Sequence, residues 1–291
     1  MTNCNRKLIT VFTPTYNRCN ELVVLYESLK RQSCKSFIWL IVDDGSADKT
    51  EEVVSAWIES KEIDIKYIKQ ENQGKSMAHN KGVSETETEL FVCVDSDDYL
   101  CDNAIEKIKL CWQQRKADDI GILAFRSVTG FSRKLPEGRI RTTLRQAYDK
   151  YGITGDTMLV FRTDIIGKYA FPKFENEKFV PEAYLYDLTD QEGFFILLKE
   201  VLYFGDYLED GYTKNMAKLL KNNPKGYLAF INQRLQFDKK FKHRFMDTIR
   251  YISMAKIEGE KHIIRKAVYP LIAAIAYPCG IFLYKKRYEA L

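Results

Sequence analysis

The sequence lacks the features that mark several common protein classes. Its seven cysteines are scattered and include no CxxC pair, which argues against a zinc site or a disulfide framework and for reduced thiols. Neither a P-loop nor a G-x-G-x-x-G pattern occurs, so ATPase and dinucleotide-binding functions lose their main support. The first apolar run, Leu8–Phe12, is too short for a signal peptide. We therefore expect a cytoplasmic protein.

The chain also lacks a large excess of charge of one sign. Its formal net charge of +5 gives no reason to expect nucleic acid as a partner. With 45% hydrophobic and 29% charged residues, the composition is that of an ordinary folded protein with a sizeable core. A chain of 291 residues can hold one large α/β domain, or one such domain with a helical appendage.

The first hundred residues alternate between strand and helix patterns. Strands are expected at Leu8–Thr13, Phe37–Val42, Ile65–Lys69 and Leu90–Val94, and helices at Asn20–Gln32, Lys49–Ser60 and Ser76–Ser84. This alternation predicts βαβ units, and therefore an α/β fold with a mostly parallel central sheet flanked by helices. A less regular region follows, and a further helical pattern runs from about Pro224 to Glu258.

Polar clusters follow three of the four expected strands. The motif TPTYNR comes after the first strand, DDGS after the second and DSDD after the fourth. In parallel sheets, ligands bind beyond the carboxyl ends of the strands, where the strand order reverses. The three clusters are therefore expected to face one cleft.

The third cluster places three aspartates directly after an apolar run, in LFVCVDSDDYL. These carboxylates would repel one another in a low-dielectric setting unless a cation lies among them. If the strand geometry persists to its end, Asp95 and Asp97 face the same side and Ser96 points away. The alternative is a solvated acidic turn before the next helix.

Three other segments supply groups that suit a nucleotide. Asp43 and Asp44 begin a strand-to-helix turn, where they either bind the imide N–H of a base or merely hold the turn. Lys75 opens the helix in NQGKSMAHNKGV, and helix N-termini attract anions, so this lysine could reach a base, ribose or phosphate. Pro14, Thr15 and Tyr16 add a rigid turn, a hydroxyl and an aromatic ring.

In this order and at these spacings, VFTPTYNR, IVDDGSADKT, ENQGKSMAHNKGV and VDSDDYL resemble the nucleotide-sugar domain of family 2 glycosyltransferases. The resemblance covers about the first hundred residues. It implies a GT-A type fold, a nucleotide-diphosphate sugar donor, a divalent cation (Mg²⁺ or Mn²⁺) and an inverting mechanism. Carried over by position, Asp44 would hold the base, Asp95 the ribose and Asp97 the metal. The expected donor-binding set is Pro14, Thr15, Tyr16, Asp43, Asp44, Lys75, Asp95 and Ser96.

An inverting transferase needs a general base that deprotonates the acceptor hydroxyl. The segment FENEKFVPEAYLYD, together with the later YLEDG, resembles bacterial polysaccharide-type members of the family. Glu182 is the expected base, although Ala183 stands where the family often has a second acidic residue. Glu177 and Asp156 remain its rivals, and a helix-start charge is the alternative for Glu182.

The family's processive synthases carry a Q-x-x-R-W motif, which INQRLQF lacks. We therefore expect transfer of a single sugar, with UDP as the usual nucleotide, to a glycan or lipid-linked acceptor in cell-surface polysaccharide synthesis. A non-catalytic nucleotide-sugar-binding protein and a membrane-surface adaptor are the alternatives. The expected domains are a glycosyltransferase domain at 1–215 (donor half to about 100, acceptor half 101–215), a helical extension at 216–262 and an apolar, basic segment at 263–291.

The last of these segments contains an uncharged stretch, Ala267–Tyr284. Basic residues flank it at both ends: Arg265, Lys266, Lys285, Lys286 and Arg287. A straight helix of this length spans roughly 27 Å against a hydrocarbon core of about 30 Å, and Pro270 and Pro278 would kink or break it. We expect a surface-lying or re-entrant anchor at the inner face of a bacterial cytoplasmic membrane, with buried core helices as the alternative.

Overall fold

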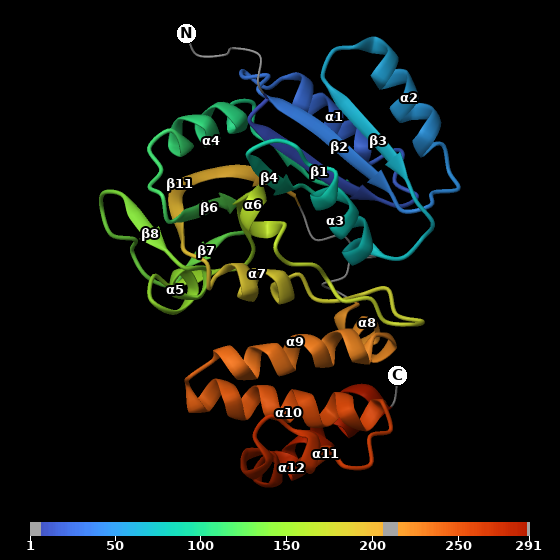
Figure 1. The fold of residues 1–291 in the computed structure, drawn as a ribbon, viewed down its shortest axis with the longest axis vertical. Helices are drawn as coiled ribbons and strands as arrows, with labels where there is room; N and C mark the ends of the chain where they lie inside the picture. The colour runs from blue at the N-terminus through green and yellow to red at the C-terminus, as the bar shows by residue number, and fades with distance from the viewer. Residues whose placement is uncertain (1–6, 206–214, 290–291) are drawn as a thin grey trace. The chain divides into compact units, whose positions relative to one another are not determined.

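The computed structural model describes residues 7–205 and 215–289 (Figure 1). The strands are β1 Ile9–Thr15, β2 Phe37–Asp43, β3 Ile65–Lys69, β4 Leu90–Cys93, β5 Tyr99–Leu100, β6 Asp119–Arg126, β7 Gly130–Phe131, β8 Ile140–Thr142, β9 Ile153–Thr154, β10 Thr157–Arg162 and β11 Phe194–Phe204. The helices are α1 Leu22–Lys30, α2 Thr50–Ser60, α3 Lys75–Ser84, α4 Ala104–Trp112, α5 Leu144–Asp149, α6 Thr163–Ile166, α7 Ala183–Thr189, α8 Met216–Asn222, α9 Pro224–Phe237, α10 Phe241–Ile257, α11 Ile263–Lys266 and α12 Pro270–Tyr284, followed by a π-helical turn, Lys285–Glu289.

The central sheet has the order β3-β2-β1-β4-β10-β6-β11-β5, and β8 pairs with β11. Strands β3, β2, β1 and β4 are parallel, as expected from the alternating pattern. Strand β10 runs antiparallel between β4 and β6, so the second half of the sheet is mixed. The strand order reverses at β1, because β2 lies on one side of it and β4 on the other, and such a reversal is where parallel sheets bind ligands.

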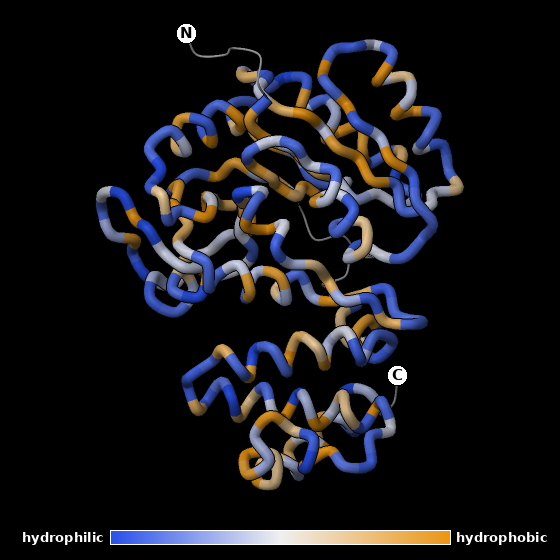
Figure 2. The backbone as a smooth tube through the Cα atoms, in the orientation of Figure 1, coloured by the Kyte–Doolittle hydropathy of each residue, from blue (hydrophilic) through white to orange (hydrophobic). Residues whose placement is uncertain are grey.

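Helices cover both faces of this sheet, and its strands form the apolar centre seen in orange in Figure 2. Inward-facing residues of α1, α2 and α4 pack on one face in a single buried cluster with β1, β2 and β4. On the other face α3 lies so close to β1 that a Cβ atom at Gly82 would be only 2.4 Å from the ring of Phe12. The glycine therefore permits this close packing. The Phe12 ring in turn stacks on Phe91, with ring centroids 5.3 Å apart.

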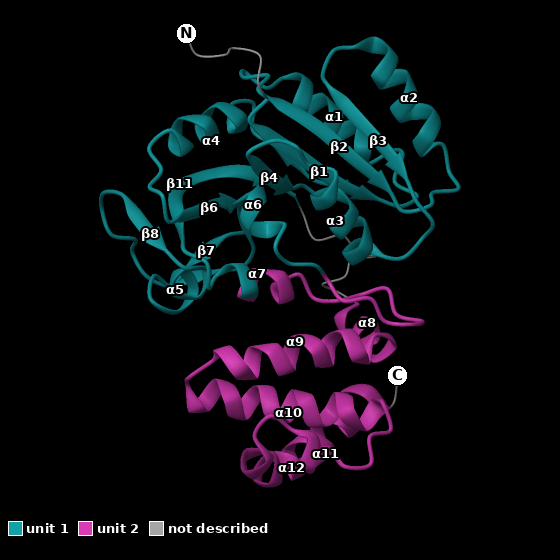
Figure 3. Ribbon diagram, in the orientation of Figure 1, with its two compact units in different colours: residues 1–170, 188–206 teal, residues 171–187, 207–291 magenta. Residues whose placement is uncertain are grey.

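The chain forms two compact units that do not follow chain order (Figure 3). The first contains Met1–Ala170 and Leu188–Asp206, and the second contains Phe171–Asp187 and Tyr207–Leu291. Residues 171–187, which we expected within the acceptor half of one continuous domain, thus group with the C-terminal helices.

The second unit is built on three helices. Helix α10 packs between α9 and α12, and the expected helical stretch from Pro224 to Glu258 is divided into α9 and α10. Helix α12 begins at Pro270, so the uncharged stretch from Ala267 is interrupted there as expected, but the helix continues through Pro278 without the expected break. Within the described residues, no helix is both long and apolar enough to cross a membrane.

Candidate functional site

Three polar segments lie along one edge of the sheet in the first unit. Thr15 at the end of β1 pairs with Asp43 at the end of β2, and β4 runs parallel to β1 on its other side. The backbone N–H of Asp44 donates to the carbonyl of Thr15 at 2.8 Å, which joins the first two segments directly. The parallel pairing therefore brings the TPTYNR, DDGS and DSDD segments to the same edge, as expected.

Asp43 stabilises the turn after β2. Its side chain is fully buried, and its two carboxylate oxygens accept hydrogen bonds from the Ser46 backbone N–H at 2.7 Å and the Tyr67 hydroxyl at 2.5 Å. Burial and this hydrogen bond raise the pKa of Tyr67 above its usual value. Asp43 thus holds the turn that presents its neighbour Asp44.

Asp44 connects this turn to the segment that leads into α3. One carboxylate oxygen accepts from the side-chain amide of Gln70 at 2.7 Å and from the backbone N–H of Gln73 at 3.0 Å. The other oxygen accepts from the backbone N–H of Gly74 at 2.7 Å. Gly74 has a φ of 92° and Gly45 a φ of 84°, which other residues rarely adopt. The carboxylate therefore fixes the start of α3, and with it the position of Lys75.

The end of β1 contributes a buried hydroxyl and an exposed ring. Thr15 is only 3% exposed, and its Oγ1 has no hydrogen-bond partner among the described residues. Tyr16, the next residue, is 50% exposed. The turn after it is held by Asn17, whose N–H donates to the hydroxyl of Ser46 and whose side chain accepts from Ala47. Pro14 lies within β1, opposite Val42.

The acidic segment after β4 forms a tight turn. Strand β4 ends at Cys93, and the backbone N–H of Asp98 donates to the carbonyl of Asp95 at 3.2 Å. The strand geometry that we assumed through Asp97 is thus replaced by a turn. Asp95 and Asp97 are nevertheless both partly exposed, whereas Ser96 and Asp98 are buried.

Asp95 and Asp97 share an environment of charges. Lys75 Nζ lies 2.7 Å from Asp95 Oδ1, so this lysine reaches the acidic turn. Burial raises the pKa of Asp97, and the negative charge of Asp95 raises it further, while Arg18 and Lys75 act in the opposite direction. The two carboxylates are therefore close enough to repel each other.

This repulsion provides a test of whether the residues fit a divalent cation. A cation beside Asp97 would convert an unfavourable pair of like charges into a favourable site. No group of three His, Cys, Asp or Glu side chains that could hold a metal occurs in residues 7–205 and 215–289. Mg²⁺ commonly binds through one or two carboxylates together with substrate phosphates, so the acidic turn fits a cation that arrives with a diphosphate.

The third aspartate, Asp98, belongs to a buried network that the sequence did not reveal. Its Oδ2 accepts from the Tyr203 hydroxyl at 2.6 Å and lies 2.9 Å from Arg126 Nη2. The Tyr203 oxygen also accepts the backbone N–H of Asp95 at 3.0 Å, and the Arg126 guanidinium lies 4.2 Å from the Tyr203 ring centroid. Burial raises the pKa of Asp98 to about 6. These hydrogen bonds fix the acidic turn to β11. Because Tyr203 is more than a hundred residues from the turn in sequence, no local motif could have indicated the network.

Replacing Tyr203 by Phe is expected to destabilise the protein by about 1–3 kcal/mol, because Asp98 and the N–H of Asp95 lose a buried partner. The measurement is the free energy of unfolding in urea. Tyr148→Phe is the matched control, since the Tyr148 hydroxyl makes its hydrogen bonds at the exposed surface. Equal losses in the two variants would contradict a special role for Tyr203.

The three candidate bases have different surroundings. Glu182 belongs to the second unit and directly precedes α7; its carboxylate accepts from the Tyr186 hydroxyl at 3.1 Å. Asp156 belongs to the first unit, has a side chain that is 54% exposed, and lies 3.9 Å from Arg126. The YLEDG motif, which resembles the family together with the Glu182 segment, lies outside the described residues.

Glu177 is occupied by a structural role within the second unit. Its two carboxylate oxygens accept the backbone N–H groups of Lys225 and Gly226, at 2.9 and 2.8 Å, in the first turn of α9. In return, the Asn223 side chain accepts the N–H groups of Lys178 and Phe179. We call these four hydrogen bonds the α9 clasp. A carboxylate that caps a helix in this way is a weaker candidate for a general base than Glu182.

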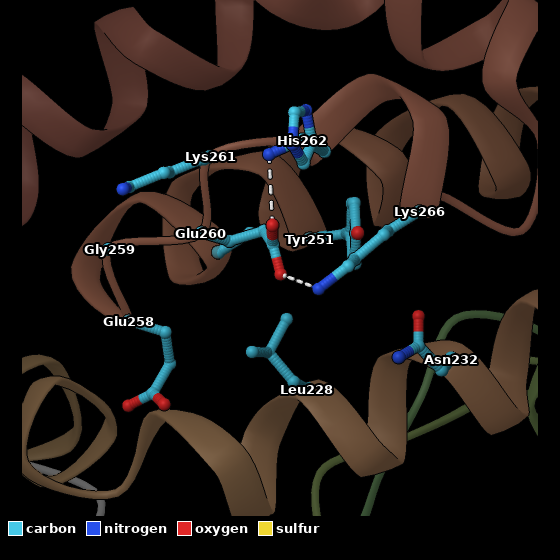
Figure 4. A pocket seen from close by; sticks show the side chains of 10 residues that line it. Leu228, Asn232, Tyr251, Glu258, Gly259, Glu260, Lys261, His262 and Lys266 are labelled. Carbon is cyan, nitrogen blue, oxygen red and sulfur yellow. Dashed lines mark hydrogen bonds and ion pairs between the residues drawn. The ribbon is translucent and has the colours of Figure 1, made fainter.

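Two other polar features lie outside the acidic edge. His79 is 5% exposed and packs edge-on against Phe12 and Phe91, so it is a core residue. A cavity of about 600 Å³ lies in the second unit and includes none of the expected site residues (Figure 4). Its lining is Leu228, Asn232, Tyr251, Ala255, Glu258, Gly259, Glu260, Lys261, His262 and Lys266.

Comparison with known families gives a match over more than half of the chain. The model of the family described as Glycosyl transferase family 2 matches residues 10–169. Glycosyltransferase GlyG of Streptococcus pneumoniae is 34% identical over 113 residues, which are 38% of this chain and 37% of that relative. The chain therefore matches well under half of the length of this curated relative.

Solved structures match over nearly the whole chain. S. aureus TarS 1–349 in complex with UDP-GlcNAc has a TM-score of 0.59 and 18% identity, covering 97% of this chain and 91% of that chain. The mannosyltransferase PcManGT of Pyrobaculum calidifontis, in complex with GDP-Man and Mn²⁺, has a TM-score of 0.56 and 14% identity, covering 96% and 76%. At these identities the likeness shows a shared fold, which is the α/β fold with a helical C-terminal region expected from the sequence.

Proposed function

Because this chain belongs to glycosyl transferase family 2, we propose that it transfers a single sugar from a nucleotide-diphosphate sugar to a hydroxyl group of a glycan or lipid-linked acceptor. The expected donor is a UDP-sugar and the expected setting is cell-surface polysaccharide synthesis. One observation is the main support for this proposal. The DDGS and DSDD segments lie at the same edge of the sheet, where the strand order reverses, and Lys75 contacts the second of them.

The donor would lie across this edge, with its base beside β1 and β2. The Asp44 carboxylate accepts hydrogen bonds from three N–H donors of this chain and is assigned to the imide N–H of the base because the family resemblance implies it. Thr15 supports this placement, because its buried Oγ1 lacks a hydrogen-bond partner within the described residues and could form a hydrogen bond with the nucleotide. The exposed ring of Tyr16 is available for packing against the base.

The ribose and diphosphate are assigned to the acidic turn. Asp95 would accept the ribose hydroxyls, and Lys75, which now neutralises Asp95 at 2.7 Å, would turn towards a phosphate. Asp97 would hold Mg²⁺ or Mn²⁺, and the Mn²⁺ complex of PcManGT supports that choice of ion. When bound, the cation would neutralise charge that develops on the leaving diphosphate.

Glu182 is assigned as the general base of an inverting transfer. A carboxylate in this role accepts the proton of the acceptor hydroxyl while the oxygen attacks the sugar from the face opposite the diphosphate. Its partial burial and its hydrogen bond from Tyr186 hold the carboxylate in place. Asp156 is kept as the rival, whereas Glu177 is a weaker candidate because it is engaged in the α9 clasp.

The donor can be tested by thermal unfolding of the full chain with UDP-, GDP- and dTDP-sugars, each with and without Mn²⁺. A ligand that binds only the folded state adds about 2.7 kcal/mol of stability at 100 times its dissociation constant. We expect the largest shift with a UDP-sugar and Mn²⁺, and loss of that shift in Asp95→Asn. Asp102→Asn, which changes an exposed aspartate paired with Arg31, is the matched control.

Two outcomes would count against this function. If no sugar nucleotide shifts the melting temperature, the donor assignment is wrong. If donors bind but no sugar is released or transferred with any glycan or lipid-linked acceptor, the protein is a non-catalytic nucleotide-sugar-binding protein instead.

A further inference from the structure

Helix α12 has one buried face and one exposed apolar face. Ala273, Ala276 and Gly280 are buried, and a Cβ atom at Gly280 would lie 2.5 Å from the Ile252 side chain on α10. Exposed apolar residues lie on the other side: Leu271 is 84% exposed, Ile275 71% and Phe282 65%. Their spacing of four and seven residues places these three side chains on one stripe of the helix. Exposed apolar side chains gathered in this way mark an interaction surface.

Positive charge borders this stripe at both ends. Residues 261–287 contain six lysines and arginines and no aspartate or glutamate. Arg265 is exposed before the helix, and Lys285, Lys286 and Arg287 are exposed after it. Within the part of the chain that the structure describes, Lys266 of this group pairs with an acidic residue, Glu260. The surface therefore combines an apolar stripe with basic ends.

We propose that the exposed stripe of α12, with its basic ends, binds the surface of an anionic lipid bilayer. Leu271, Ile275 and Phe282 would enter the boundary between headgroups and acyl chains, and the basic residues would contact anionic headgroups. Tyr277 and Tyr284 are partly buried against the helical core and lie outside this stripe. The surface would keep the enzyme beside a lipid-linked acceptor, but the binding itself does not depend on the proposed transfer reaction.

The helix is expected to lie in the plane of the membrane. Its 15 residues span about 22 Å, which is less than the roughly 30 Å of a hydrocarbon core. Its buried face packs on α10, so lipid can reach α12 from one side only. This arrangement fits a helix that rests on the bilayer with its apolar face downward.

A second copy of the chain is a poorer occupant of the same surface. A stripe about 22 Å long on a helix about 10 Å wide offers far less than the roughly 800 Å² per partner of a stable interface. Pairing two such stripes would also bring together the basic ends of both copies, and like charges repel. Anionic headgroups, by contrast, complement these charges.

Vesicle flotation of the full chain, without any sugar donor, tests the proposal. We expect at least tenfold more bound protein on phosphatidylcholine vesicles that contain phosphatidylglycerol than on phosphatidylcholine alone, with binding weakened by salt. Leu271→Asp and Ile275→Asp should each reduce binding at least tenfold. Val24→Asp is the matched control, because Val24 is an exposed apolar residue on a helix of the first unit. Lys285→Gln with Lys286→Gln should lower binding to the anionic vesicles.

Insertion can be observed directly through Cys279, which is exposed on α12. An environment-sensitive fluorophore on this thiol should shift to shorter wavelength with anionic vesicles, and a labelled Cys279→Ser chain reports the background from the other cysteines. The proposal fails if anionic vesicles do not bind the folded full chain, or if Leu271→Asp binds as well as Val24→Asp. Dimers in light scattering that Ile275→Asp dissociates, together with no vesicle binding, would assign the stripe to a second copy. Donor shifts in thermal unfolding are unaffected by either result, so the two proposals can fail separately.

Discussion

Asp97→Asn is expected to lower metal-dependent sugar transfer by about a hundredfold to a thousandfold, the range seen when a group that stabilises transition-state charge is removed. The carboxylate is partly exposed at the acidic turn, where burial and the charge of Asp95 raise its pKa. An asparagine of the same shape cannot supply the negative charge that holds a dication beside the diphosphate. The measurement is turnover of the donor over a titration of Mn²⁺.

The fold of this variant should be intact, because burial and the charge of Asp95 disfavour the ionised Asp97 carboxylate more than Arg18 and Lys75 favour it. Its melting temperature is therefore expected to equal or exceed that of the parent. Asp102→Asn serves as the control for an aspartate change outside the site. Normal turnover and normal Mn²⁺ dependence in Asp97→Asn would show that the metal assignment is wrong.

Glu182→Gln is expected to keep donor binding and to lose transfer by roughly 10²-fold or more, as for the removal of a general base. The amide keeps the size of the side chain and can still accept the hydrogen bond of Tyr186, but it cannot take a proton from the acceptor. The measurements are single-turnover transfer and the donor-induced shift in melting temperature. A loss of donor binding equal to the loss of transfer would indicate a disturbed fold instead.

Glu177→Gln provides the contrast, because its expected defect is one of stability. The Lys225 and Gly226 N–H groups of the α9 clasp bond to different oxygens of Glu177, and glutamine replaces one of these oxygens with an NH₂ group, so one of the two N–H groups loses its acceptor in this geometry. Loss of a helix cap costs about 1 kcal/mol, while transfer should change little. If Glu177→Gln instead lost more transfer than Glu182→Gln, the base would be Glu177.

The first hundred residues could be predicted well from sequence because their information is local. Most of the strands there are short apolar runs that end in a turn signal, and the observed strand β3, Ile65–Lys69, which alternates between apolar and basic residues, has the expected bounds. The parallel order follows from alternating strands and helices. The end of β4 could not be placed so well, since Val94 is as apolar as the strand before it and the turn at Asp95 depends on a hydrogen bond from its N–H to Tyr203.

Other features depend on pairs of residues that are distant in sequence. In the sequence, Asp98 is indistinguishable from the other acidic residues of the motif. Its contacts with Arg126 and Tyr203 form only when the chain folds. The uncharged stretch around α12 likewise gives no sign of which side is buried. That choice is made by small residues such as Gly280, which lets α10 approach, while Leu271 remains exposed.

The α9 clasp has a consequence for chimeric proteins. The segment that carries Glu182 is joined to α9 through Asn223 and Glu177, and Gln233 adds a hydrogen bond to the Tyr184 carbonyl at 2.7 Å. Exchanging only residues 216–291 with a relative would leave 171–187 facing a foreign helix. Exchanging only 171–187 would fail for the same reason. Recombination between relatives should therefore move both pieces together, with junctions near residues 170, 188 and 206, so that the segment carrying Glu182 keeps the helix against which it packs.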